Sequence, residues 1–194
     1  LACKLYREHL KRRENRQMVM IGYSDSNKDG GIASSRWAIQ NAQEMLVAAM
    51  DNEDIELTLF HGRGGSISRG GSKTHTAVLG APPGTVNGRL RVTEQGEIIN
   101  EKYGLRGIAL RTLEQVAGSV ALATAMPRHR GNDMPEWHEM MDVVAGESRK
   151  AYRKLIYDTP GFYDYFRTAT PIDVIESSRI GSRPARRRCS CPPP

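Results

Sequence analysis

The sequence has no stretch of about 18 consecutive apolar residues, which is the shortest length expected of a helix that crosses a lipid bilayer. Its opening residues, LACKLYREHLKRRENR, also lack the apolar segment of a secretory signal. The first absence argues against a helical membrane protein, and the second argues against export. Together they favour a cytoplasmic location.

Cysteine is scarce, because the chain has only Cys3, Cys189 and Cys191. These residues lie at the two ends and form no paired spacing, so they do not predict a disulfide framework. No internal repeat is present either. What remains is a chain of 194 residues, which is long enough for one ordinary domain with a hydrophobic core.

The net charge of +6 is unevenly distributed along the chain. Five arginines and no acidic residue fall in residues 179–194, so the remainder of the chain is almost neutral. A nucleic-acid-binding domain is expected to spread its basic residues over a folded face. A basic nucleic-acid-binding module that acts through RIGSRPARRR is therefore kept only as the alternative function.

The pattern of apolar residues predicts alternating strands and helices. Strands are expected at 18–24, 54–60 and 89–95, and helices at 3–17, 33–50, 106–125, 135–157, 161–167 and 171–178. A helix between the first two strands is typical of parallel pairing. The sequence thus predicts a helix-rich α/β fold, part of a TIM-like β/α barrel or sheet, whose strands end in active-site loops.

The second predicted strand runs directly into HGRGGSISRGG, residues 61–71. Glycines let the backbone approach a ligand closely, and Arg63 and Arg69 supply forks of donors for phosphate or carboxylate oxygens. The loop therefore predicts an anion site for a small phosphorylated metabolite. An exposed RGG segment of a nucleic-acid-binding tail fits less well, because this loop is single and embedded. His61 fits a general acid or base and, equally well, a core histidine that fixes the strand end.

The first predicted strand leads into DSNKDGG, which we expect to be a loop that carries Asp25, Lys28 and Asp29. Carboxylate oxygens suit Mg²⁺, which usually takes only one or two protein carboxylates. A turn in which Asp25 or Asn27 caps the next helix explains the same residues at least as well. If the strands are parallel, this segment lies near Arg63.

Other polar residues carry weaker signals. Arg183, in the sequence GSRP, suits a third phosphate-binding fork. The segment MPEWHEMMDVV is expected to be core with a polar outer face. Four further residues are interpreted as structural: Glu94, Glu97, Tyr103 and His138.

Four segments occur together in this order: MVMIGYSDSNKDGG, LTLFHGRGGSISRGG, GRLRVTEQGEII and YFRTATPIDVIESSRIGSRPARR. Their order and spacing resemble phosphoenolpyruvate carboxylase, from Met18 to Arg188. The resemblance implies that residues 1–188 are a fragment of that enzyme's catalytic barrel and come from the carboxyl-terminal half of the enzyme. Residues 189–194, CSCPPP, then form an atypical tail from a truncation or a shifted reading frame.

The resemblance also implies an activity, in which phosphoenolpyruvate and bicarbonate give oxaloacetate and inorganic phosphate with Mg²⁺ or Mn²⁺. By position in the family's motifs, Asp25 matches a metal ligand and Lys28 a charged residue close to the bound anions. Arg63 matches a substrate-binding arginine, and Arg183 matches a residue that supports the phosphate. The full-length family enzyme is usually a homotetramer, and neither a nucleic acid nor a membrane is expected as a partner.

The glycine-rich loop supplies two further residues with implied roles. His61 matches a histidine that helps position the reacting groups, and it joins Arg63, Lys28 and Arg69 as a candidate catalytic residue. Arg69 matches an arginine that an inhibiting aspartate can draw away from the active site. The family's essential histidine, a second acidic metal ligand and a later arginine are absent from this chain. We therefore expect the isolated 194-residue protein to be inactive.

Overall fold

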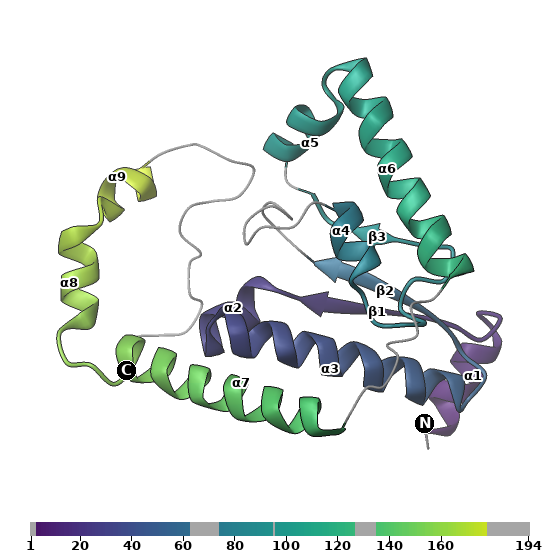
Figure 1. The fold of residues 1–194 in the computed structure, drawn as a ribbon, viewed down its shortest axis with the longest axis horizontal. Coiled ribbons are helices and arrows are strands. Elements are labelled where there is room, and N and C mark those ends of the chain that lie inside the picture. Colours follow the sequence, from purple (N-terminus) through teal and green to yellow (C-terminus); the bar gives the residue numbers. More distant parts are fainter. Residues whose placement is uncertain (1–2, 63–73, 95, 127–134, 178–194) are drawn as a thin grey trace.

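The computed structural model describes residues 3–62, 74–94, 96–126 and 135–177, and Figure 1 shows their arrangement. The described residues form an α/β fold that is rich in helix, as the sequence predicts. Its elements in chain order are α1 (Lys4–Lys11), β1 (Arg16–Gly22), α2 (Ser24–Gly30), α3 (Ile32–Asp51), β2 (Glu56–Gly62), α4 (Thr74–Leu79), β3 (Arg91–Val92), α5 (Gly96–Tyr103), α6 (Arg106–Ala125), α7 (Pro135–Ile156), α8 (Phe162–Ala169) and α9 (Ile172–Ser177).

The three strands form one parallel sheet in the order β1-β2-β3. β1 and β2 pair over their whole length, and the register ends with Gly22 opposite Gly62. β3 is only two residues long, shorter than the predicted strand at 89–95, and it pairs with the end of β2. The predicted parallel pairing of the first two strands is confirmed, so their carboxyl ends lie at the same edge of the sheet.

One face of the sheet is covered by α3, and α7 packs against α3, so the sheet and the two helices form successive layers (Figure 1). The core between sheet and helix contains Ile21, Leu59 and Ile39, whose exposed fractions are 7%, 3% and 8%. A second small core of Leu10 and Met50 with Ile55 closes the amino-terminal end of the strands. α4 and α5 pack against α6.

The other face of the sheet is more open. Met18 and Met20 alternate with the half-buried Val19 and the buried Ile21, and their exposed fractions are 43% and 61%. Phe60 lies opposite Met20 in the register, and the guanidinium carbon of Arg91 is 5.0 Å from the centre of its ring. The two faces of the same strands therefore differ in how fully the described residues cover them.

Two predictions near the start of the chain are wrong in detail. The first helix ends at Lys11 rather than at residue 17, because Glu14 and Asn15 adopt positive φ angles of 54° and 55° and turn the chain into β1. The segment DSNKDGG forms α2 instead of a loop. α4 and α5 were not predicted, whereas the helices predicted at 33–50, 106–125 and 135–157 are confirmed with small shifts at their ends.

The Met-rich start of α7 was expected to be core, and this expectation is wrong for the chain as it stands. Trp137, Met140 and Val143 have exposed fractions of 60%, 58% and 66%. The buried residue of α7 is Ala145. The apolar stripe exists, but the described residues do not cover it.

Candidate active site at the carboxyl edge of the sheet

The ends of β1 and β2 bring one predicted site segment beside the first two residues of another, His61 and Gly62. Gly22 and Gly62 pair in the sheet, so the chain leaves both strands at one edge. It enters α2, with Asp25 and Lys28, from one strand and reaches Arg63 directly after the other. Arg63 itself lies outside the described residues, as do Arg69, Arg183 and the tail at 189–194.

A hydrogen bond joins the two strand ends. The hydroxyl oxygen of Tyr23 and Nδ1 of His61 are 2.8 Å apart, and the two rings lie at a tilt. The backbone N–H of Thr93 donates to the carbonyl oxygen of His61 at 3.1 Å. The His61 side chain is 6% exposed and belongs to the sheet face that α3 covers, beside Ile21. This geometry fits a histidine that fixes the strand end, while a proton-transfer role stays a prediction.

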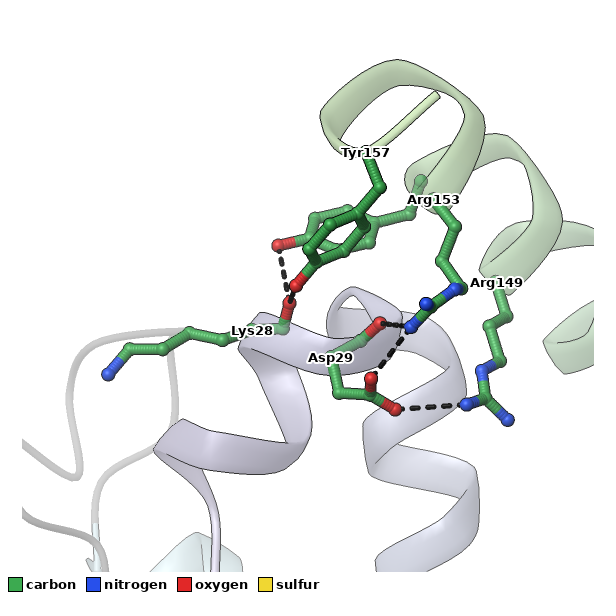
Figure 2. A network of polar contacts seen from close by, with 6 residues as sticks. Lys28, Asp29, Arg149, Arg153 and Tyr157 are labelled. Atoms are coloured by element: carbon green, nitrogen blue, oxygen red, sulfur yellow. Dashed lines mark hydrogen bonds and ion pairs between the residues drawn. The ribbon is translucent and has the colours of Figure 1, made fainter. Parts of the chain in front are cut away.

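Asp25 and Lys28 lie on α2, and both are exposed. The residue that precedes the helix is Tyr23, and no side chain caps the helix there. The interpretation of Asp25 or Asn27 as a cap of the following helix is therefore wrong, because both residues lie inside α2. Figure 2 shows the Lys28 side chain extending away from the contacts that its backbone makes with the end of α7.

The second carboxylate of this segment has a different environment. Asp29 Oδ2 is 2.9 Å from Nη2 of Arg149, and Asp29 Oδ1 is 2.7 Å from Nη1 of Arg153 (Figure 2). Two arginines of α7 therefore already hold this carboxylate in ion pairs. Of the two aspartates, Asp25 is left as the candidate metal ligand.

Asp25 does not complete a metal site within the described residues. Among them, no group of three or more His, Cys, Asp and Glu side chains could hold a metal ion. A single carboxylate still fits Mg²⁺, because this ion keeps several waters and takes substrate oxygens as ligands. The chemistry of Asp25 is thus compatible with a metal that other groups also bind.

A cavity of about 670 Å³ lies beside these strand ends. Its polar lining includes Tyr23, His61 and Gln43, and its apolar lining includes Trp37 and Val86. Gln43 is 6% exposed, and its Oε1 atom has no hydrogen-bond partner among the described residues. No sequence pattern indicated this cavity, because its lining comes from segments far apart in the chain.

Three of the residues interpreted as structural make contacts that fit that interpretation. Lys102 Nζ is 2.5 Å from Oε1 of Glu94. Burial raises the pKa of Tyr103, and the nearby carboxylate of Glu94 raises it further. His138 packs against Trp37 with 5.1 Å between the ring centres.

Sequence reasoning missed a group of residues, in α7 and directly after it, that contact α2. Arg149, Tyr152, Arg153 and Tyr157 all reach the carboxyl end of α2. Their spacing of three, four and eight residues from the first puts them on one helix face. That spacing is the only signal in the sequence, and it does not name the partner of the face.

Helices layered on a parallel sheet, with polar residues where the strands end, define a parallel α/β protein of the class that carries its site at that edge. The profile of one family, described as phosphoenolpyruvate carboxylase, matches residues 1–191. The chain belongs to the phosphoenolpyruvate carboxylase family.

Curated relatives agree with this assignment. The chain is 56% identical over 187 residues to a phosphoenolpyruvate carboxylase of Xanthomonas oryzae pv. oryzae, which covers 96% of this chain and 21% of the relative. It is 49% identical over 172 residues to one of Shewanella loihica, covering 89% of this chain and 19% of the relative. The match to one of Ralstonia nicotianae is 46% over 175 residues. The chain thus spans about a fifth of the length of these relatives.

The expectation that the chain does not cross a membrane can be compared with the described part of the chain. None of its helices is both long enough and apolar enough to cross a membrane. The alternative of a nucleic-acid-binding module depends on residues 179–188, which lie outside the described residues.

Proposed function

We propose that this chain supplies part of the active site of an enzyme that carboxylates phosphoenolpyruvate with bicarbonate, giving oxaloacetate and inorganic phosphate. The names of the relatives support the reaction. The structural observation that carries the proposal is the register of Gly22 with Gly62, reinforced by the bond between Tyr23 and His61. Because of this pairing, the segment with Lys28 follows β1 at the sheet edge where β2 ends at Gly62, the residue before Arg63 in the sequence.

Different candidate residues bind different parts of the two anionic substrates, phosphoenolpyruvate and bicarbonate. In this proposal Arg63 and Arg183 hold the phosphate of phosphoenolpyruvate, and Lys28 adds a positive charge beside the bound anions. Asp25 binds Mg²⁺ or Mn²⁺, which when bound supplies the positive charge that stabilises an enolate. His61 holds the loop at the strand end, so that the reacting groups meet in a fixed orientation.

The reaction that the family implies balances without a further reactant. An oxygen of bicarbonate attacks the phosphorus atom, and the bond between phosphorus and the enol oxygen breaks. Carboxyphosphate and the enolate of pyruvate result. Carboxyphosphate releases carbon dioxide and inorganic phosphate, which keeps the proton of bicarbonate. The enolate carbon then bonds to the carbon dioxide. Water has to be excluded meanwhile, because it would protonate the enolate.

We also propose that β1, β2 and β3 are one part of a β/α barrel. In such barrels the helices lie outside the strands, as α3 does here, and the inner face is filled by side chains of the strands. The open face with Met18 and Met20 is then the inner face. Assembly of the complete enzyme as a homotetramer is part of the same family-based proposal.

The first experiment tests the chain by itself. We expect the purified 194-residue protein to form no oxaloacetate from phosphoenolpyruvate, bicarbonate and Mg²⁺. A coupled assay with malate dehydrogenase measures this as NADH oxidation. Any turnover above that of a blank preparation would overturn the expectation that the isolated chain is inactive.

The second experiment tests the site in a complete enzyme. A hybrid is made from the Xanthomonas oryzae relative, with its matching segment replaced by that of this chain. We expect the hybrid to form oxaloacetate. The substitutions Lys28→Ala and Arg63→Ala should each lower kcat/KM on the order of 10²- to 10³-fold, the effect of removing a group that stabilises transition-state charge. Lys150→Ala, on the exposed side of α7, is the matched control and should leave the rate unchanged.

A further inference from the structure

The carboxyl end of α2 is held by a helix more than 100 residues further along the chain (Figure 2). The holding residues are Arg149, Tyr152 and Arg153 of α7, together with Tyr157, which directly follows that helix. We call these four residues the α7 clamp. The three helical residues lie on one face of α7 because they are three and four positions apart. Tyr157 continues this face, since its backbone N–H donates to the carbonyl oxygen of Arg153 at 2.8 Å.

The clamp contacts the backbone of α2 as well as a side chain. The hydroxyl groups of Tyr152 and Tyr157 both donate to the carbonyl oxygen of Lys28, at 3.0 and 2.9 Å. Nη1 of Arg153 donates to the carbonyl oxygen of Asp29 at 3.1 Å and also to its carboxylate. The last carbonyl groups of a helix have no partner within the helix, so these contacts complete the end of α2.

The turn that follows α2 fits closely beneath the clamp. Gly31 has φ 77° and ψ 169°, a conformation that is essentially confined to glycine. A Cβ atom at Gly31 would lie 3.0 Å from the Tyr152 ring. The guanidinium carbon of Arg153 lies 4.7 Å from the centre of the Tyr157 ring, so the clamp residues also contact one another.

The contacts of the clamp are poorly explained by stability alone. The side chains of Asp29, Arg149 and Arg153 are 60%, 53% and 41% exposed, and ion pairs that are so exposed contribute little to stability. All the contacts converge on the backbone and side chain of two neighbouring residues of a seven-residue helix. A helix this short does not hold its own geometry.

We propose that the α7 clamp is a set of positioning residues that orients α2 at the active site. This inference rests on the proposed function, because it assumes that Lys28 and Asp25 act on bound anions and metal. The clamp holds the carbonyl group of Lys28 while its ammonium group extends away from α7 (Figure 2). Asp25 lies one turn earlier on the same helix, so both side chains take their direction from the clamped backbone.

The variant that tests the clamp removes only its two hydroxyl groups. In the hybrid enzyme, Tyr152→Phe combined with Tyr157→Phe keeps both rings and removes both bonds to Lys28. A misplacement of about 1 Å can lower kcat/KM on the order of 10²-fold. We expect the KM values for Mg²⁺ and phosphoenolpyruvate to rise about tenfold, with a smaller change in kcat, because Asp25 and Lys28 bind these ligands.

The matched control lies on the same helix but contacts α3 instead of α2. Nε1 of Trp37 donates to Oδ1 of Asp142 at 2.6 Å in the amino-terminal half of α7. Asp142→Asn weakens this contact because a neutral amide oxygen is a weaker acceptor than a carboxylate. This variant should leave both KM values within about twofold of the unsubstituted hybrid. If Asp142→Asn raises them as much as the tyrosine pair does, α7 has only a structural role and the proposal is wrong.

A conservative variant gives a second kinetic comparison. Arg153→Ala removes the bonds to the carbonyl group and carboxylate of Asp29, whereas Arg153→Lys keeps a positive charge that can reach one of them. We expect the alanine variant to raise the KM for Mg²⁺ and the lysine variant to restore much of the loss. Equal KM values in the two variants would contradict a positioning role for the charge.

Hydrogen exchange separates failure of the clamp from failure of the proposed function. The amides of Asn27 and Gly31 donate within and at the end of α2, at 3.1 and 2.9 Å. In the 194-residue chain, these amides should exchange several times faster in the variant that lacks both tyrosine hydroxyls. Their exchange should be unchanged in Asp142→Asn. Unchanged exchange in the tyrosine variant overturns the clamp. An inactive unsubstituted hybrid overturns the proposed function instead, and with it the positioning role, even where the exchange result holds.

Discussion

The two faces of the sheet are built from the same strands and have different surroundings. On the face towards α3, Ile21 and Leu59 are 7% and 3% exposed, whereas Met18 and Met20 on the opposite face are 43% and 61% exposed. Within the described part of the chain, the face towards α3 is therefore the better covered of the two. Because it spans about a fifth of the length of its relatives, this asymmetry fits a section of a larger structure in which other segments meet the open face.

The largest expected difference in stability is between two variants, each of which truncates one side chain on one face of the sheet. Leu59→Ala should lower the free energy of unfolding by about 2 to 5 kcal/mol, because it removes buried methyl groups and leaves a cavity. Met20→Ala should change it by no more than about 0.5 kcal/mol, as at most exposed positions. Urea denaturation of the 194-residue chain, followed by circular dichroism, measures both. Similar losses for the two variants would show that the open face is covered in solution.

A somewhat smaller effect is expected at the contact between α2 and α7, which lies beyond α3 on the covered side of the sheet. Gly31→Ala should destabilise the chain by about 1 to 3 kcal/mol, because alanine rarely adopts a conformation of this kind. Its Cβ would also press against the ring of Tyr152. Gly146→Ala in α7 is the matched control, since a Cβ there meets nothing within 4 Å. This control should be neutral or stabilising by up to about 1 kcal/mol.

Thermal unfolding of the two glycine variants gives the measurement. If Gly31→Ala unfolds at the same temperature as the unsubstituted chain, the turn between α2 and α3 is free to rearrange. The layer formed by α2 and α7 would then be looser than the layer between the sheet and α3.

The parallel strands could be predicted because their information is local. The runs at 18–24 and 54–60 are short and apolar, they end in polar segments, and a helical pattern separates them. The formation of α2 could not be predicted in the same way. Its residues DSNKDG favour a turn, and the bonds that complete its carboxyl end come from Tyr152, Arg153 and Tyr157. A contact across more than 100 residues leaves no periodic signal at α2.

The apolar stripe of α7 shows a second limit. The pattern of Trp137, Met140 and Val143 indicates which side of the helix is apolar, and it led to the wrong expectation of a buried core. Periodicity identifies a face that can be buried, but it does not show whether the same chain provides the cover. The same limit applies to Met20 on the open face of the sheet.

The candidate site was predictable to the extent that it follows from strand ends. The expectation that the segment with Asp25 and Lys28 lies near the start of the loop at residues 61–71 needed only the parallel pairing of β1 and β2. The bond between Tyr23 and His61 was not foreseen, because it depends on which way each side chain leaves its strand. Nothing in the spacing of the two residues separates that arrangement from its alternatives.

The smallest of these effects concerns that bond, at the edge where the covered face meets the candidate site. Tyr23→Phe keeps the ring against His61 and removes one hydrogen bond, so we expect a loss of about 1 kcal/mol in the free energy of unfolding. We expect the hydrogen bonds near the strand end to be weakened more than the stability of the whole chain. The amide of Thr93 donates to the carbonyl oxygen of His61 and reports on the strand end, so its exchange should quicken more than that of amides in α3. If Tyr23→Phe lowered the free energy of unfolding as much as Leu59→Ala, the covered face would depend on this bond as much as on its apolar packing. The two faces would then differ in polar contacts as well as in burial.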